Sequence, residues 1–274
     1  MHGDVPGPGV GTPRHPAPPT PVPATTPAPA PVPAPAPRTR APLPPLGYLP
    51  LRLAPRRRLP QLLVGLALYG FGLSAMVRAS LGVNPWSVLY EGVQRHTSLS
   101  FGTVNGLVGA FVLLLWIPLR QRPTFGTVAN IVVLSFSSDL GLALLPPHPG
   151  LPARVGLLLG GVLLNGLSVA IYVGARLGPG PRDGLMTGTS AATSRSIRFV
   201  RTLMEVTVLA VGVLLGGSVG PGTVLYAVAI GPTAQSLLPR FAYRTAADRR
   251  RDDEKDARAA PVSSGWRLRT PRRP

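Results

Sequence analysis

The near absence of acidic residues from the middle of the chain limits what it can fold into. Residues 61–240 contain only four acids, which are Glu91, Asp139, Asp183 and Glu205. A soluble domain of this size needs far more charge to cover its surface. The middle of the chain is therefore predicted to lie in lipid rather than in water.

Six apolar stretches in this region approach the length that crosses a bilayer. A hydrocarbon core of about 30 Å needs about 20 helical residues. The stretches contain frequent Gly and Pro, which membrane helices tolerate. We predict an all-α, polytopic membrane protein with about six transmembrane helices, at residues 61–80, 100–118, 125–145, 153–175, 201–218 and 222–239.

The two ends of the chain differ from this middle region. Twenty of the thirty-five prolines lie in residues 1–60, in Pro/Ala runs that form neither helix nor sheet. The end of the chain mixes Arg runs with acidic runs, a composition typical of solvated disorder. We predict a disordered Pro/Ala-rich tail at residues 1–58, a transmembrane domain at 59–240 and a disordered charged cytoplasmic tail at 241–274.

The net charge of +18 has an explanation in membrane topology. Arginines gather before the first apolar stretch, after the second, between the fourth and fifth, and after the sixth, whereas the alternate connections carry few. Cytoplasmic loops of membrane proteins carry such an excess of Lys and Arg. We therefore predict a bacterial inner (cytoplasmic) membrane protein with both termini in the cytoplasm, and no nucleic-acid partner.

The two halves of the apolar region resemble each other at an offset of 96 residues. Residues 79–92 align with 175–188, and residues 126–128 align with 222–224. Each half then holds three spans, and this odd number makes the second half enter the membrane from the opposite side. We predict two inverted three-helix repeats, at about 59–147 and about 152–240, a layout typical of secondary transporters.

Each half also contains a break after its first span. Gly and Pro at residues 82–85 and 178–184 end the preceding helices. Short amphipathic stretches follow at 86–96 and 185–199, and a helix that starts there points its free N–H groups back toward the break. We predict half-helices that dip into the membrane. The alternative is a pair of surface loops with interfacial helices.

The motifs at and beyond these breaks resemble those of the YczE/YitT-like family of bacterial integral membrane proteins. The residues that carry the resemblance are GPGPRDGLM at 178–186, LGVNPW at 81–86, RTLME at 201–205 and AIGP at 229–232. The likeness covers about residues 61–240 and omits both tails. It implies a multi-pass protein of the cell membrane, in a family mostly without an assigned substrate.

Candidate binding residues lie at the two breaks and inside the apolar stretches. An ionisable group at membrane depth costs at least ~2.5 kcal/mol, so it needs a partner, water or a function. Asp139 has Gln235 as its counterpart at the same offset, which indicates a shared cavity. The predicted substrate site comprises Asn84, Pro85, Trp86, Arg182, Asp183, Gly184, Asp139, Gln235 and Glu205.

Three of these residues also have structural interpretations. Asp139 is either a coupling carboxylate or a structural acid bonded to a neighbouring Ser or Arg. Asp183 is expected to cap the second half-helix. Glu205 follows Arg201 by four residues, so an ion pair within one helix is the simpler account.

Enzyme signatures are missing from the sequence. The four His have no metal-ligand spacing, and there is no Cys. No nucleophile elbow and no phosphate-binding loop occur. We expect no enzyme activity, no metal and no cofactor. The leading hypothesis is a secondary transporter or permease-like protein for an unknown small molecule or ion, with a homo-oligomer left open. The alternative is a non-transporting membrane scaffold or regulatory partner.

Overall fold

The described part of the chain is all-helical. The computed structural model describes residues 3, 48–248 and 250, and most of the predicted N-terminal tail lies outside them. No strand occurs among the described residues, and the predicted all-α class is confirmed. The helices are α1 (Pro55–Ala79), α2 (Pro85–Arg95), α3 (Phe101–Trp116), α4 (Phe125–Leu144), α5 (Leu151–Gly174), α6 (Pro181–Thr193), α7 (Ile197–Leu214) and α8 (Pro221–Phe241).

Several helices have the character of membrane spans. By length and composition, α1, α4 and α5 are long and apolar enough to cross a membrane, and α3 is apolar but only 16 residues long. Large apolar side chains such as Phe111, Val132 and Leu163 are exposed on the outside of the bundle. An exposed apolar surface of this kind suits lipid, because lipid tails are as apolar as these side chains.

The helices of the two halves begin at a constant spacing. The starts of α1 and α5, α2 and α6, α3 and α7, and α4 and α8 are each separated by 96 residues. The caps of α3 and α7 also match. Ser100 accepts a hydrogen bond from the Thr103 N–H at 3.1 Å, and Ser196 accepts one from the Phe199 N–H at 3.2 Å. The offset found in the sequence is thus also the spacing of the helix starts.

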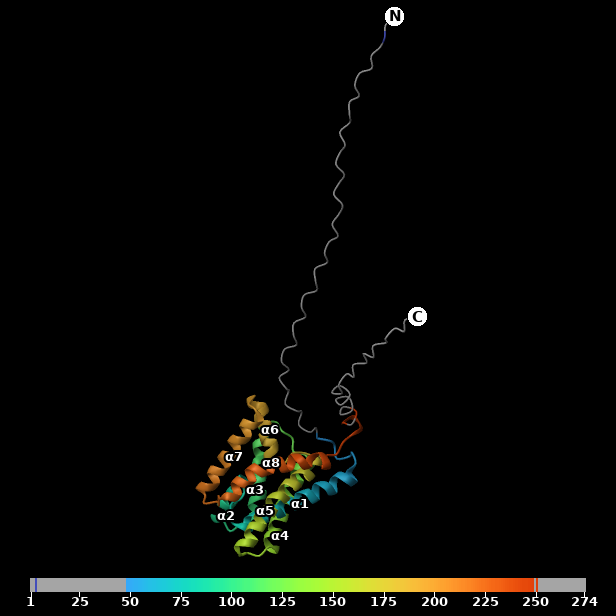
Figure 1. The fold of residues 1–274 in the computed structure, drawn as a ribbon. Helices are drawn as coiled ribbons and strands as arrows, with labels where there is room; N and C mark the ends of the chain where they lie inside the picture. The colour runs from blue at the N-terminus through green and yellow to red at the C-terminus, as the bar shows by residue number, and fades with distance from the viewer. Residues whose placement is uncertain (1–2, 4–47, 249, 251–274) are drawn as a thin grey trace. The chain divides into compact units, whose positions relative to one another are not determined.

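The first helices of the two halves, α1 and α5, pack side by side in opposite directions (Figure 1). Near the start of α1, a Cβ on Gly65 would lie 2.7 Å from the backbone nitrogen of Tyr172, near the end of α5. At the other end of α1, the Arg154 Nε donates to the Ala79 carbonyl at 2.7 Å. Glycine at position 65 therefore permits a close antiparallel approach.

The last helix of each half runs parallel to the first helix of the same half. Ser74 in α1 donates to the Ser138 carbonyl in α4 at 2.7 Å, and further along Arg78 donates to the Leu142 carbonyl. The matching contacts between α5 and α8 are those of Gly166 with Thr233 and of Gly174 with Phe241. Because α1 and α5 are antiparallel, α4 and α8 also point in opposite directions.

The short helices pack on the opposite half of the bundle. α2 packs against α7, and α6 packs against α3. The Cβ of Leu215 comes 2.7 Å from where a Cβ on Gly92 would lie, and Leu119 approaches Gly188 in the same way at 3.2 Å. These four residues are again two pairs 96 positions apart. The two halves are therefore intertwined rather than set side by side.

The start of α1 corrects the predicted extent of the N-terminal tail. Residues 48–58 were predicted to be disordered, but they pack on the end of α5. The fully buried Arg58 guanidinium donates five hydrogen bonds, at 2.8–3.0 Å. Their acceptors are the carbonyl oxygens of Leu49, Pro50, Leu53, Ala175 and Arg176. All five N–H donors of this side chain are used, so burying its charge is compensated.

The segment after α8 corrects the predicted start of the C-terminal tail. Residues 242–248 return to the same end of the bundle, where the Tyr243 N–H donates to the Gly174 carbonyl at 2.8 Å. Asp248 accepts from the N–H and hydroxyl of Thr245 and forms an ion pair with Arg176 at 2.5 Å. These hydrogen bonds, those from Thr245 first, lower the pKa of Asp248 to about 2. The rest of the predicted tail, except residue 250, lies outside the described residues.

The second half-helix is also shorter than predicted. The prediction placed it at 185–199, whereas α6 ends at Thr193 and Ser194 adopts a left-handed conformation with φ of 54°. α7 then begins at Ile197, capped by Ser196, rather than at residue 201. The Ser-rich sequence between the two helices supplies both the stop and the new cap, a signal that hydropathy alone does not register.

Candidate functional site

The starts of α2 and α6 form the centre of the candidate site. The same order of backbone conformations precedes each helix. A residue in the left-handed conformation is followed by a glycine with positive φ, then by the N-cap, and then by Pro as the first helical residue. The residues are Ser80, Gly82, Asn84 and Pro85 before α2, and Arg176, Gly178, Gly180 and Pro181 before α6. Pro fits the first helical position because an N–H there would have no acceptor within the helix, so nothing is lost by its absence.

Each of these two loops is held by the other half of the chain. The Gly222 N–H at the start of α8 donates to the Leu81 carbonyl at 2.8 Å, and the Gly126 N–H at the start of α4 donates to the Leu177 carbonyl at 3.2 Å. A Cβ on Gly82 would lie 2.6 Å from the backbone nitrogen of Gly220. Glycine is required at this crossing for its positive φ and for the close approach.

The two helix starts differ in their caps. The Asn84 side chain accepts the Ser87 N–H of α2 at 3.1 Å. Gly180 occupies the same position before α6 and has no side chain to do so. Asp183 was predicted to cap this helix but lies within its first turn, because α6 begins at Pro181. The first N–H groups of α6 therefore lack a side-chain cap.

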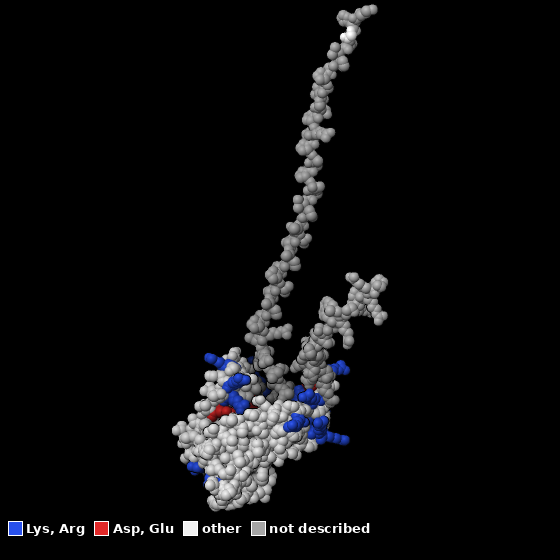
Figure 2. Space-filling model, in the orientation of Figure 1, with Lys and Arg blue, Asp and Glu red and all other residues white. Residues whose placement is uncertain are grey.

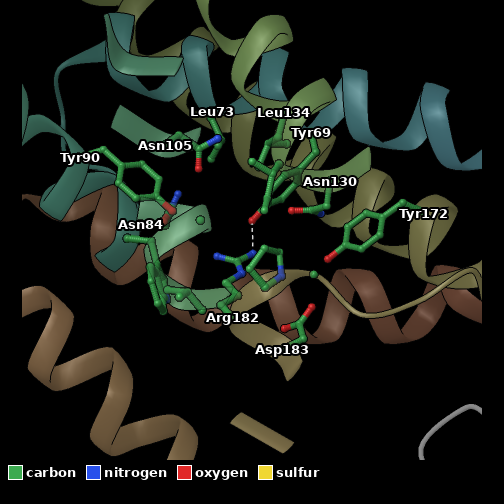
Figure 3. A pocket seen from close by; sticks show the side chains of 16 residues that line it. Tyr69, Leu73, Asn84, Tyr90, Asn105, Asn130, Leu134, Tyr172, Arg182 and Asp183 are labelled. Carbon is green, nitrogen blue, oxygen red and sulfur yellow. Dashed lines mark hydrogen bonds between the residues drawn. The ribbon is translucent and has the colours of Figure 1, made fainter. Parts of the chain in front are cut away.

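Arg182 occupies the middle of the site, surrounded by tyrosines from three helices. Its guanidinium donates to the Tyr69 hydroxyl and lies 5.6 Å from the centre of the Tyr69 ring (Figure 3). The Tyr69 and Tyr226 hydroxyl oxygens are 3.2 Å apart, and the Tyr69 and Tyr172 rings are 6.0 Å apart between centres. A cation over an aromatic face is stabilised without a counter-charge.

A small cavity of about 40 Å³ adjoins the Arg182 side chain. That volume holds a few water-sized groups. Most of its lining side chains are polar or aromatic, and they come from α1, α2, α3, α4, α5 and α6. They include Tyr69, Asn84, Trp86, Tyr90, Asn105, Asn130, Tyr172, Arg182 and Asp183, most of which are labelled in Figure 3.

A large cavity of about 390 Å³ shares part of this lining and extends between α7 and α8. Asn84, Trp86, Tyr172, Arg182 and Asp183 line both cavities. The rest of the large cavity is mainly apolar, with side chains such as Val169, Met186, Met204, Ile230 and Leu238. Its size and lining are typical of a small-molecule site with a few fixed polar groups.

The structure brings most of the predicted site residues together. Seven of the nine line the large cavity, namely Asn84, Pro85, Trp86, Arg182, Asp183, Glu205 and Gln235. Gly184 serves packing, because a Cβ there would lie 2.0 Å from the Trp116 ring, whose Nε1 donates to the Pro181 carbonyl at 2.9 Å. Asp139 is not among the residues that line either cavity.

Asp139 lies where α4 meets the start of α3. Its carboxylate accepts hydrogen bonds from the Ser100 hydroxyl and from the Gly102 N–H, the latter at 2.7 Å. The predicted shared cavity of Asp139 and Gln235 does not form, because Asp139 is directed to the α3 N-terminus, whose N–H groups attract a negative charge. Gln235 is exposed at the edge of the large cavity.

The ion pair within α7 matches its structural interpretation. Arg201 Nε and Glu205 Oε1 are 3.0 Å apart, and the two side chains are 54% and 40% exposed. Both residues nevertheless line the large cavity. The pair therefore lies at the rim, where water screens its attraction.

Sequence reasoning missed the tyrosines and the buried asparagines. Asn105 and Asn130 are 6% and 8% exposed inside apolar helices, and the Asn105 Nδ2 has no hydrogen-bond partner in the described structure. Their counterparts 96 residues later are Arg201 and Tyr226, which line the large cavity. A comparison of the polar residues at the 96-residue offset could have identified these positions from the sequence. Among the described residues, no cluster of His, Asp and Glu has the size of a metal site.

Comparisons with known proteins identify the family of this chain. A family of unknown function, DUF6198, matches residues 56–239. An uncharacterized protein of Haemophilus influenzae is 40% identical over 177 residues, 65% of this chain and 81% of the relative. The uncharacterized membrane protein YczE of Bacillus subtilis is 31% identical over 178 residues, 64% of this chain and 83% of YczE. No solved structure matches.

Proposed function

Because this chain belongs to the DUF6198 family of YczE-like membrane proteins, we propose that it is a secondary transporter that moves a small molecule by alternating access. The single observation that carries the proposal is the large cavity of about 390 Å³, which holds a charged side chain at the meeting point of the two halves. A protein with a purely structural role has no need for a cavity of that size around a half-buried cation.

The helix directions support an inverted-repeat layout. In the proposed layout, α1, α3 and α4 run up, down and up through the bilayer, while α5, α7 and α8 run down, up and down. The antiparallel pairs α1 with α5 and α3 with α4 favour this arrangement, as do the parallel pairs α1 with α4 and α5 with α8. The half-helices α2 and α6 then start inside the membrane from opposite sides.

The distribution of charge supports cytoplasmic termini. Figure 2 shows most basic side chains along the upper edge and the right-hand end of the domain, with a broad uncharged surface below them and a few basic atoms at the lower left. The starts of α1 and α7 and the ends of α5 and α8 carry arginines, which include Arg56, Arg57, Arg176, Arg198, Arg201 and Arg240. The positive-inside rule assigns these ends to the cytoplasm.

The two halves differ at the interface between their last two helices. In the first half, α3 packs on α4, and we call this the α3–α4 seam. In the second half, the large cavity separates α7 from α8, and we call this the α7–α8 seam. With the topology above, the protein is open to the cytoplasm and closed to the outside. A transporter alternates by exchanging these two states.

A labelling experiment tests alternating access without knowledge of the substrate. The chain has no Cys, so Val169→Cys places a single thiol in the large cavity. In vesicles of each orientation, we expect a membrane-impermeant maleimide to react quickly from the cytoplasmic face and slowly from the outer face. Val132→Cys, on the exposed apolar face of α4, is the control and should react from neither.

The outcomes separate the proposed transporter from a scaffold. Reaction of Val169→Cys from the cytoplasmic face alone, with no outer reaction at long times, would contradict alternating access. Reaction from neither face would remove the accessible cavity itself. Equal protection of Val132→Cys in both vesicle types confirms that the reagent reads water access and not lipid-facing thiols.

A further inference from the structure

We infer that the transported molecule is an organic anion whose negatively charged head group binds in the small cavity beside Arg182 while its apolar body occupies the large cavity. The inference rests on the proposed function, because it names the class of substrate for that same site. It depends on three features of the two cavities: a guanidinium that forms no ion pair with the described residues, a buried amide donor without a partner among them, and a largely apolar second compartment.

Among the described residues, Arg182 takes part in no ion pair. Its hydrogen bond goes to the neutral Tyr69 hydroxyl. The ion pairs formed by the described residues are Arg176 with Asp248 and Arg201 with Glu205, and neither includes Arg182. Asp183 is its neighbour in sequence, but in Figure 3 the carboxylate lies on the far side of the backbone from the guanidinium. An anionic ligand supplies the missing charge.

Asn105 provides an independent indication of a ligand. Its side chain is 6% exposed, lines the small cavity, and has an Nδ2 atom without a hydrogen-bond partner in the part of the chain that the structure describes. A buried amide N–H₂ left unpaired costs about 1–3 kcal/mol. An unpaired amide N–H₂ on a side chain that lines a cavity beside a guanidinium fits an oxygen acceptor, as a carboxylate presents.

The start of α6 lines the same small cavity. Gly180 leaves the first N–H groups of α6 without a side-chain cap, whereas Asn84 closes the equivalent start of α2. An uncapped helix start attracts negative charge. The two starts are therefore not equivalent. Asp183 already places a carboxylate in the first turn of α6, so this helix start supports an anion site only together with Arg182 and Asn105.

The sizes of the cavities define the two parts of the ligand. The small cavity of about 40 Å³ accommodates a head group of a few atoms, such as a carboxylate. The large cavity of about 390 Å³ continues from it past Val169, Met204 and Ile230. Glu205, the acid of α7 that lines the large cavity, already forms an ion pair with Arg201. An apolar body therefore fits there better than a second charge.

Three probes with one body and different heads test the charge class. Purified full-length protein in detergent at pH 7 is titrated with 3-phenylpropionate, 3-phenylpropanol and 3-phenylpropylamine, and binding is followed by thermal unfolding and tryptophan fluorescence. Trp86 lines both cavities and reports occupancy. We expect the carboxylate to bind about tenfold more tightly than the alcohol or the amine, because hydrogen bonds to a charged group stabilise a complex more than those to a neutral group.

Two variants locate the head group. Arg182→Gln and Asn105→Leu should each weaken binding of 3-phenylpropionate by about tenfold and change binding of 3-phenylpropanol by less than about twofold. Asn165→Leu is the matched control, because Asn165 is fully buried but lines neither cavity, and it should leave binding of both unchanged. If Arg182→Gln does not fold, the inference is still tested by the selectivity of the wild type among the three probes and by the affinity of Asn105→Leu for 3-phenylpropionate.

The result that overturns the inference is distinct from the one that overturns the proposed function. Two results reject an anionic substrate at this site and leave the transporter proposal standing. One is tighter binding of the amine or the alcohol than of the carboxylate. The other is a loss of affinity for 3-phenylpropionate in Asn165→Leu equal to that in Arg182→Gln and Asn105→Leu. Absence of binding for all three probes rejects the inference as well. The Val169→Cys labelling needs no ligand, so it judges alternating access in either case.

Discussion

The α3–α4 seam and the α7–α8 seam occupy equivalent places in the two halves, yet only the second contains a large cavity. Along α3, the residues that face α4 are Gly102, Gly106 and Gly109. Their counterparts 96 positions later in α7 are Arg198, Thr202 and Glu205. Glycines let two helices approach closely, whereas long side chains hold them apart.

The difference teaches how one repeated unit can produce two unlike surfaces. A Cβ on Gly102 would lie 2.0 Å from the Ser135 carbonyl oxygen, so the α3–α4 seam has no room for a side chain there. Asp139 then ties the two helices together at Ser100 and Gly102. In the second half, Gln235 replaces Asp139 and leaves the α7–α8 seam without an equivalent carboxylate. The helix starts keep one spacing in the two halves, and the side chains differ where the two seams differ.

The largest effect is expected from filling the α3–α4 seam. Gly102→Val introduces a branched side chain where backbone already lies in contact, and should cost about 3 kcal/mol or abolish folding. Arg198→Val, at the equivalent position of α7, should leave the midpoint of thermal unfolding nearly unchanged. The amount of monodisperse protein and its unfolding midpoint in detergent measure both. Equal tolerance of the two substitutions would break the comparison.

Removal of the Asp139 charge is expected to have the next largest effect. Asp139→Asn weakens two hydrogen bonds to the start of α3 and should cost about 2 kcal/mol. Gln235→Leu, at the matching position of α8, should stay within about 0.5 kcal/mol. Reversible unfolding in mixed detergent compares the two variants. We also expect Asp139→Asn to speed labelling of Val169→Cys from the outer face. An unchanged labelling rate would show that Asp139 does not keep the α3–α4 seam closed.

The Arg201–Glu205 pair should contribute little. The two exposed side chains form an ion pair at 3.0 Å on one helix, and such pairs are worth about 0.5 kcal/mol. A double-mutant cycle with Arg201→Ala and Glu205→Ala measures the coupling. A coupling several times larger, or insensitivity to salt, would mean that the pair braces the α7–α8 seam rather than lying at its rim.

The smallest effect on the bundle is expected at the segment after α8, outside both seams. Because the folded-state pKa of Asp248 is lowered to about 2, its contribution is present above its ordinary pKa of 3.8 and disappears as pH falls through about 2. A spin label at Ala247 should become more mobile over that range, and in Asp248→Asn at pH 7. Mobility that does not depend on either change would contradict the described contacts.

The sequence predicted the helices, the two breaks and the offset that relates them, because hydropathy, Gly and Pro act locally. It also placed seven of the nine candidate residues around one cavity. It did not predict that Arg58 would be buried with five hydrogen bonds, or that Tyr69 and Tyr226 would meet, because both depend on how distant helices pack. The contacts of Asp139 match its structural interpretation, but the identity of its partner, Ser100 at the start of α3, was not predictable for the same reason.

The most direct test of the central claim compares the two seams at equivalent positions in one preparation. Spin labels at Thr103 and Leu140 report on the α3–α4 seam, and labels at their counterparts Phe199 and Ser236 report on the α7–α8 seam; all four positions are exposed. In the ligand-free protein, we expect pulsed electron paramagnetic resonance to give a clearly longer distance for Phe199 with Ser236. Equal distances across the two seams would contradict an asymmetric, inward-open pair of repeats.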